Sequence, residues 1–225
     1  MKVILSAVTL VLSIYACSNI SVSNAHNPSE RELIFHLIIN KDNYLNSIYG
    51  ESPQIAIWLE DSAKTQMKNV YVTYKSGKND WVGKVYCKVA LPYWQSRLNS
   101  FSGNDPELEN ELDAVTRATS KNDKVFAGIH LPENSVWKYF VEINVAGDYN
   151  GYFSTYSANG IPDMDGNGQP SVVYGGTIEI KKGNESIPKI IGRTLQLRET
   201  DELISDLSGI TSAKHILSSI KVKVL

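Results

Sequence analysis

The chain has 225 residues, of which 42% are hydrophobic and 20% are charged. This length and composition allow a sizeable core and are typical of one folded domain, and they exclude a disordered chain. The formal net charge is -2, with Lys and Arg scattered along the chain, so the sequence lacks the basic patch of a nucleic-acid-binding protein.

The N-terminus has the pattern of an export signal. Lys2 precedes an apolar run, Val3–Ala16, which is long enough for the core of a signal peptide but too short to span a bilayer. The run leads into Ile14–Cys17, which resembles a bacterial lipobox in which Cys17 becomes the lipidated first residue. The alternative is ordinary cleavage after Ala25 and soluble secretion. We predict a protein exported to the periplasm or outer cell envelope, held to the membrane only by a lipid on Cys17.

Three regions follow from this pattern. Residues 1–17 form the signal peptide, residues 18–31 a polar tether, and residues 32–225 a single domain. In that domain, apolar residues alternate with a period of two, as in strands with one buried face. The alternating segments are 33–39, 53–61, 69–75, 82–91, 136–147, 171–183 and 215–225.

Helices are expected in only three places, residues 92–101, 106–115 and 200–207. Turn residues separate the strands, at Pro53, at Gly77–Asp80, at Gly147–Asp148 and at Gly166–Gly168. Short strands and turns without regular intervening helices favour a mainly β protein. We predict an antiparallel, immunoglobulin-like β-sandwich with a few short helices.

Standard catalytic signatures are absent from the sequence. It has no nucleophile elbow, no HExxH zinc motif, no phosphate-binding P-loop and no dinucleotide fingerprint. The four His residues lack metal-ligand spacing. Once Cys17 is lipidated, Cys87 remains alone, and its alternating surroundings favour a small buried side chain over a nucleophile.

One loop carries the spacing of a calcium ligand set. Asp163, Asp165 and Asn167 occupy positions 1, 3 and 5 of such a loop, and Gly168 occupies position 6, where the loop needs a glycine. Position 12 is Tyr174 instead of the bidentate Glu. Two interpretations stay open, a calcium site and a tight turn between strands, in which Asp, Asn and Gly are also favoured.

The segment Asp113–Thr119, with the sequence DAVTRAT, is similar to the motif by which extracytosolic flavoproteins are covalently loaded with FMN. The resemblance implies that Thr119 forms a phosphoester with FMN and that Asp113 and Thr116 are recognition residues. Arg117 is a candidate partner for the phosphate charge. The alternative is that Asp113 and Thr116 only cap backbone groups at a helix end or turn.

A wider resemblance covers about Pro53 to Ile180. PQIAIWLED, VYVTYKSGKNDW, LPYW, DAVTRATS, VEINVAGDYN and GQPSVVY occur in the order seen in a bacterial family of predicted periplasmic proteins, domain of unknown function 2271. The resemblance implies export and redox partners, namely a flavin transferase and a membrane redox protein of the PepSY type. It implies a redox carrier more readily than a turnover enzyme.

Two function hypotheses follow. The first is an exported, lipid-anchored protein that carries covalent FMN for extracytosolic electron transfer. Trp94, Trp137 and Tyr149 are then candidates to cover the flavin ring, although aromatic residues of a sandwich are more often core. The second is a cofactor-free binding or structural module of the cell envelope.

Overall fold

A computed structural model of the protein describes residues 30–81, 87, 89–103, 116–117, 123–157 and 159–225. Its helices are α1 (Lys41–Leu45), α2 (Tyr74–Lys78), α3 (Pro92–Ser102) and α5 (Ser212–His215). Its strands are β1 (Glu30–Ile39), β2 (Gln54–Asp61), β3 (Met67–Thr73), β4 (Thr116–Arg117), β5 (Lys124–Pro132), β6 (Val136–Asn144), β7 (Val172–Glu179), β8 (Glu185–Ser186), β9 (Lys189–Arg193) and β10 (Leu217–Val224).

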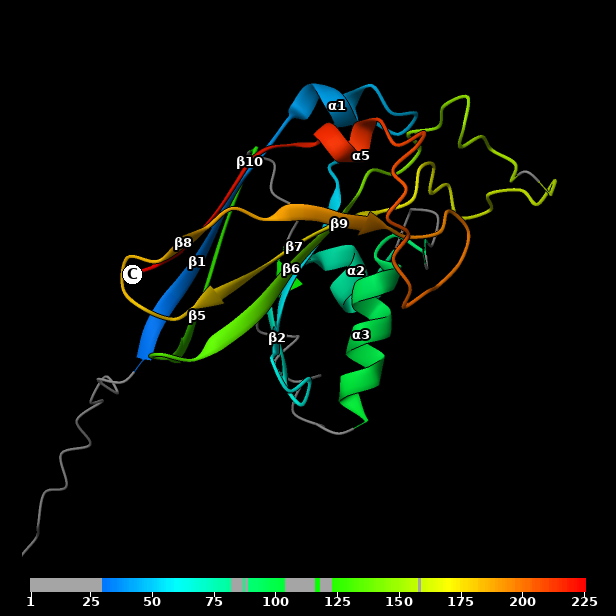
Figure 1. The fold of residues 1–225 in the computed structure, drawn as a ribbon. Helices are drawn as coiled ribbons and strands as arrows, with labels where there is room; N and C mark the ends of the chain where they lie inside the picture. Colours follow the sequence, from blue (N-terminus) through cyan, green and yellow to red (C-terminus); the bar gives the residue numbers. More distant parts are fainter. Residues whose placement is uncertain (1–29, 82–86, 88, 104–115, 118–122, 158) are drawn as a thin grey trace, which may run out of the picture.

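The strands form two sheets that pack face to face (Figure 1). Sheet A has the order β5-β1-β10-β8 and sheet B the order β4-β3-β2-β6-β7-β9. All pairings are antiparallel except the one between β3 and β4. Phe35 of sheet A meets Tyr139 of sheet B edge to face, with ring centroids 5.8 Å apart. The predicted antiparallel β-sandwich with few short helices is confirmed.

The core between the sheets comes from the predicted alternation. In β1, Leu33, Phe35, Leu37 and Ile39 all point into it and are buried, while the residues between them are partly exposed. Strand β2 differs, because seven of its eight residues are buried. A strand can bury consecutive residues only when both faces of its sheet are covered.

Helix α3 is the cover for the second face of sheet B (Figure 1). Trp94, Leu98 and Phe101 lie on one side of this helix, at the spacing of a helical face. They form a second core with the outward residues of β2, Ala56 and Trp58. This core creates the closed environment in which several polar side chains of sheet B are buried.

Some sequence predictions are wrong in detail. Residues 200–207 are not a helix, because the backbone N–H and C=O of Ile204 pair with Arg193 at the end of β9. In segment 82–91, the described residues Cys87, Val89 and Ala90 form a turn instead of a strand, and the N–H of Ala90 bonds to the carbonyl of Cys87. Strand β1 starts at Glu30, inside the expected tether.

Two further predictions concern helices. The expected turn Gly77–Asp80 begins inside α2, and Asn79, which follows the helix, has a left-handed conformation with φ of 51°. The predicted helix 92–101 is confirmed as α3. The predicted helix 106–115 lies outside the described residues.

Candidate functional site

The described part of the attachment-like segment is a strand at the edge of sheet B. Thr116 and Arg117 form β4, which runs parallel to β3 with Thr116 opposite Val72 and Arg117 opposite Thr73. β4 is the last strand in the order of the sheet. Helix α2 follows β3 directly and contacts β4. The segment therefore approaches the folded domain at a sheet margin and not through the core.

The other residues predicted for flavin attachment are not placed. Asp113 and Thr119 lie outside the described residues, and so does the predicted lipidation residue Cys17. The ring of Tyr74 is 44% exposed, and this residue starts α2 immediately after the residue that pairs with Arg117. Among the described residues, it is the exposed aromatic side chain directly adjoining the β3–β4 pairing.

The three aromatic residues considered as flavin covers all form hydrogen bonds within the protein. Trp94 and Trp137 are buried, and their indole N–H groups donate to Asn69 Oδ1 and Ser135 Oγ, both at 2.9 Å. The hydroxyl of Tyr149 donates to Asp163 at 2.9 Å. Trp94 and Trp137 are core residues, as the alternative interpretation expected.

A fully buried carboxyl group that the sequence did not reveal lies under α3. Glu142, on β6, accepts hydrogen bonds from the backbone N–H groups of Tyr93 and Trp94 at the start of α3, at 3.2 and 2.6 Å. Ser171 Oγ donates to the same carboxyl at 2.5 Å and also contacts Thr194 Oγ1 at 2.8 Å. Burial raises the pKa of Glu142 to about 7, although these hydrogen bonds act to lower it.

A second buried carboxyl group follows β6. Asp148 accepts hydrogen bonds from the backbone N–H of Gln169 at 2.7 Å and from the hydroxyl of Ser212, the first residue of α5. The side-chain amide of Gln169 donates to the backbone carbonyl of Asp148 at 2.6 Å and to the hydroxyl of Thr211 at 3.0 Å, and its oxygen accepts from the backbone N–H of Thr211 at 2.7 Å. Burial raises the pKa of Asp148 to about 7, while the hydrogen bond from Ser212 opposes that rise. Both carboxyl groups tie loops and helix ends to the sandwich.

The predicted calcium residues form a tight turn. Asp163 accepts hydrogen bonds from the backbone N–H groups of Asp165 and Gly168, at 3.2 and 2.9 Å, besides the one from Tyr149. Asn167 is fully buried, and its oxygen accepts a hydrogen bond from Asn144 at 2.9 Å. The oxygens of Asp163 and Asn167 are thus used by the protein's own donors. The described residues contain no group of three His, Cys, Asp or Glu side chains that could hold a metal.

We expect Asp163→Ala to lower the free energy of unfolding by about 1–2 kcal/mol, because three donors lose their acceptor. EDTA is expected to change the melting temperature of the wild-type protein by less than about 1 °C. Thermal melts with and without EDTA measure both effects. A fall of more than about 5 °C on adding EDTA would instead establish a bound metal.

The thiol of Cys87 packs beside this turn. Its Sγ contacts Asn167 Oδ1 at 3.8 Å and the residue is buried. Burial first, and then the charges of Asp165 and Asp163, raise its pKa to about 12. The thiol stays protonated at neutral pH, so it is a poor nucleophile. Its predicted role as a small buried side chain is confirmed.

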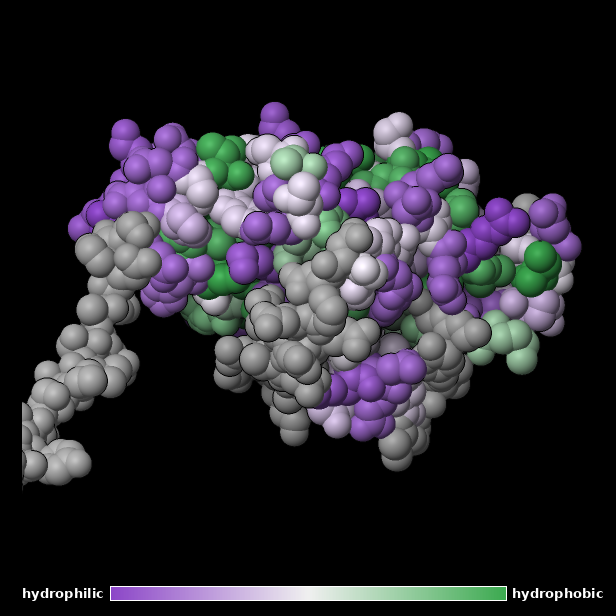
Figure 2. Space-filling model, turned by 90° about the horizontal axis from the view of Figure 1, so that it is seen from below, coloured by the Kyte–Doolittle hydropathy of each residue, from purple (hydrophilic) through white to green (hydrophobic). Residues whose placement is uncertain are grey.

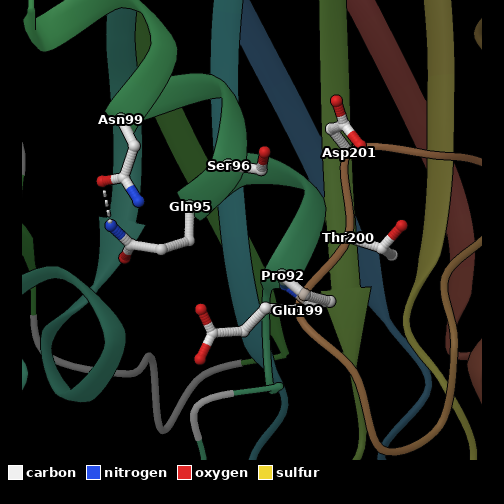
Figure 3. A pocket seen from close by; sticks show the side chains of 7 residues that line it. All are labelled: Pro92, Gln95, Ser96, Asn99, Glu199, Thr200 and Asp201. Atoms are coloured by element: carbon white, nitrogen blue, oxygen red, sulfur yellow. Dashed lines mark hydrogen bonds between the residues drawn. The ribbon is translucent and has the colours of Figure 1, made fainter.

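A cavity of about 330 Å³ lies between α3 and the segment that follows β9 (Figure 3). Its lining residues are Pro92, Gln95, Ser96, Asn99, Glu199, Thr200 and Asp201. The side chain of Gln95 donates to Asn99 at 3.1 Å, and the lining includes two carboxyl groups but no cation and no aromatic ring. This cavity does not fit FMN, because the phosphate would face like charge and the ring would have no stacking partner.

The fold and these sites define an antiparallel β-sandwich with one helix-covered sheet and an attachment-like segment at its edge. No protein-family model, no curated protein and no solved structure matches the chain. The resemblance to domain of unknown function 2271 stays a hypothesis based on the quoted segments. Among the described residues, no helix has the length and apolar character needed to traverse a bilayer.

Proposed function

We propose that this protein is an exported, lipid-anchored β-sandwich of the cell envelope that carries covalent FMN on Thr119 and passes electrons extracytosolically. The motif Asp113–Thr119 carries the proposal, together with the export signal at the N-terminus. A flavin transferase would load the protein, and a membrane redox protein of the PepSY type would exchange electrons with it. When bound, FMN supplies one- and two-electron redox chemistry.

The position of β4 supports this proposal. A modifying enzyme must close around the backbone that carries the acceptor hydroxyl, and a sheet margin offers more access than an internal strand. Thr116 and Arg117 anchor the segment to β3 by backbone pairing, two residues before Thr119. The exposed ring of Tyr74 adjoins this pairing and is suited to stack on an isoalloxazine ring.

We expect Thr119→Ala to abolish covalent flavin completely, because the hydroxyl that forms the phosphoester is removed. Intact-mass spectrometry of protein co-expressed with its flavin transferase measures the loading. Ser120→Ala is the matched control, since it removes the neighbouring hydroxyl and should leave the added FMN mass in place. Wild-type protein without added FMN would refute the proposal.

The second candidate is a cofactor-free envelope protein that binds a partner through its surface. It is favoured by a projecting loop at residues 149–157 and 159–164, which has several exposed apolar side chains and one charged residue, Asp163. If the mass measurement finds no flavin on the wild-type protein, this candidate replaces the first.

A further inference from the structure

The segment between Gly147 and Gly166 projects from one end of the sandwich, away from the start of β1 (Figure 1). We call residues 149–157 and 159–164 the loop tip. The sequence has no charged residue between Asp148 and Asp163. Four large side chains of the tip are exposed, namely Tyr152 (61%), Tyr156 (60%), Ile161 (57%) and Met164 (77%). Figure 2 shows hydrophobic residues at this projecting end of the molecule.

The apolar surface continues on a neighbouring segment. Leu45, Ile48 and Tyr49 are also exposed, and the sequence from Asn43 to Gly50 is uncharged. The backbone N–H of Ile48 bonds to the carbonyl of Gly147 at 3.1 Å, so the two segments lie side by side. Seven of the thirteen exposed large hydrophobic side chains of the described chain thus belong to these two segments.

Eight of the fourteen backbone N–H groups in the loop tip donate hydrogen bonds within the tip. Asn150 Oδ1 accepts from the N–H groups of Tyr152 and Phe153, both at 2.8 Å. Across the tip, the N–H of Ser157 bonds to the carbonyl of Ile161 and the N–H of Asp163 to that of Thr155, both at 2.8 Å. The N–H groups at positions 156, 160 and 161 also have acceptors within the tip.

These features together point to a lipid surface as the partner. Each backbone group that is already paired lowers the cost of entering the membrane interface, since hydrocarbon offers no replacement partners. Tyr is favoured at this interface because its ring is apolar and its hydroxyl stays hydrated. A bilayer also accepts a protruding tip without the matching concavity that a protein partner would need.

We propose that the loop tip inserts into the interface of a bilayer, with Ile161 and Met164 in contact with acyl chains and the tyrosines at the headgroup level. The contact needs no cationic side chain, so zwitterionic lipid suffices. It is independent of the flavin, and it is separate from the lipid on Cys17, because the tip lies at the end of the sandwich opposite to β1's first residue (Figure 1).

The experiment places an indole at the tip. Full-length processed protein with Tyr156→Trp is mixed with phosphatidylcholine vesicles that contain brominated acyl chains, which quench indoles buried in the interface. For each variant, the fluorescence of the new Trp is the signal that exceeds that of the wild type. We expect the vesicles to quench this signal at least about twofold more in Tyr156→Trp than in Ile187→Trp. Ile187 is the matched control, because it is 81% exposed and adjoins β8, far from the tip.

Two further measurements complete the test. Ile161→Asp in the Tyr156→Trp background should reduce the tip-specific quenching about tenfold, since a charge is disfavoured in the interface. Quenching should persist in about 0.5 M salt, because an uncharged contact is not screened. Equal quenching at positions 156 and 187 overturns the proposal. A blue shift at position 156 that depends on protein concentration without vesicles also overturns it, in favour of self-association.

Discussion

Titration of Glu142 alone is expected to lower the free energy of unfolding by about 2–3 kcal/mol as the pH rises from 5 to 8. The buried carboxyl of Glu142 has its pKa raised from 4.5 to about 7. Between these values the folded protein keeps a proton that the unfolded chain has lost. The stabilisation is therefore complete below the unfolded pKa and disappears as the pH passes through the folded one.

The substitution Glu142→Gln removes the titrating group but keeps an acceptor for the N-terminus of α3 and a donor for Ser171. Its melting temperature should fall about half as much between pH 5 and 8 as that of the wild type, because Asp148 still titrates in the variant. Asp148→Asn is the comparison variant, because Asp148 titrates in the same direction as Glu142. This variant should lose only the part of the pH dependence that Asp148 contributes. Parallel wild-type and Glu142→Gln curves between pH 5 and 8 would show that Glu142 does not titrate in this range.

The carboxyl groups of Asp61 and Asp206 change stability with pH in the opposite direction, because the pKa of each is lowered in the folded protein. They titrate below pH 5. Hydrogen bonds to the side chain of each group lower its pKa below the usual value of 3.8. Their contribution is lost only as the pH falls toward strongly acidic conditions. A titration from pH 5 to 8 therefore leaves these two carboxyl groups ionised throughout.

The second large effect is expected for Arg97→Met. The guanidinium of Arg97 on α3 donates to both oxygens of the buried Glu60 carboxylate, each at 2.8 Å, and Trp58 Nε1 donates to the same carboxylate at 3.1 Å. Removing the arginine leaves a buried charge with only the indole as partner, which costs about 3–5 kcal/mol. Met keeps an apolar stem next to Phe101, so the loss is mainly electrostatic.

Urea unfolding measures this effect against two controls. In Arg97→Met/Glu60→Gln, the buried charge is also removed, so at least half of the lost stability should return. Lys75→Met breaks the more exposed ion pair with Glu51, whose atoms are 2.5 Å apart, and should cost at most about 1 kcal/mol. If Arg97→Met costs no more than Lys75→Met, the Arg97–Glu60 pair does not hold α3 on sheet B.

The sequence predicts the buried residues of a strand well where apolar and polar residues alternate clearly. It fails where the second face of a sheet is covered by another element. The inward residues of β1 and β2 follow directly from the period of two. Glu142 and Asn144 alternate with apolar residues, which is the pattern of a strand with one exposed face, yet both are buried. The start of α3 covers Glu142, and Asn144 bonds to Asn167 and Gln169. The near-continuous apolar run of β2, including Ala56 and Trp58, was the available signal that sheet B is buried on both sides.

The candidate site was less predictable than the fold. Local pattern alone could not distinguish a calcium loop from the Asp163 turn, because both need Asp, Asn and Gly at the same spacing. Segment 200–207 has a helical pattern, yet the backbone of Ile204 pairs with Arg193 at the end of β9. Nothing within the segment itself indicates this partner. Long-range contacts of this kind overrule short-range propensity.

The pairing of β1 with β10 also determines the order in which the molecule can form. β10 lies between β1 and β8 in sheet A, although it is the last strand of the chain. Until Leu217–Val224 is in place, β1 lacks one of its two neighbours, and the inner residues Phe35 and Leu37 lack part of their cover. Sheet A therefore cannot be completed before β10 joins, which makes its formation depend on a contact between two segments that are far apart in the chain.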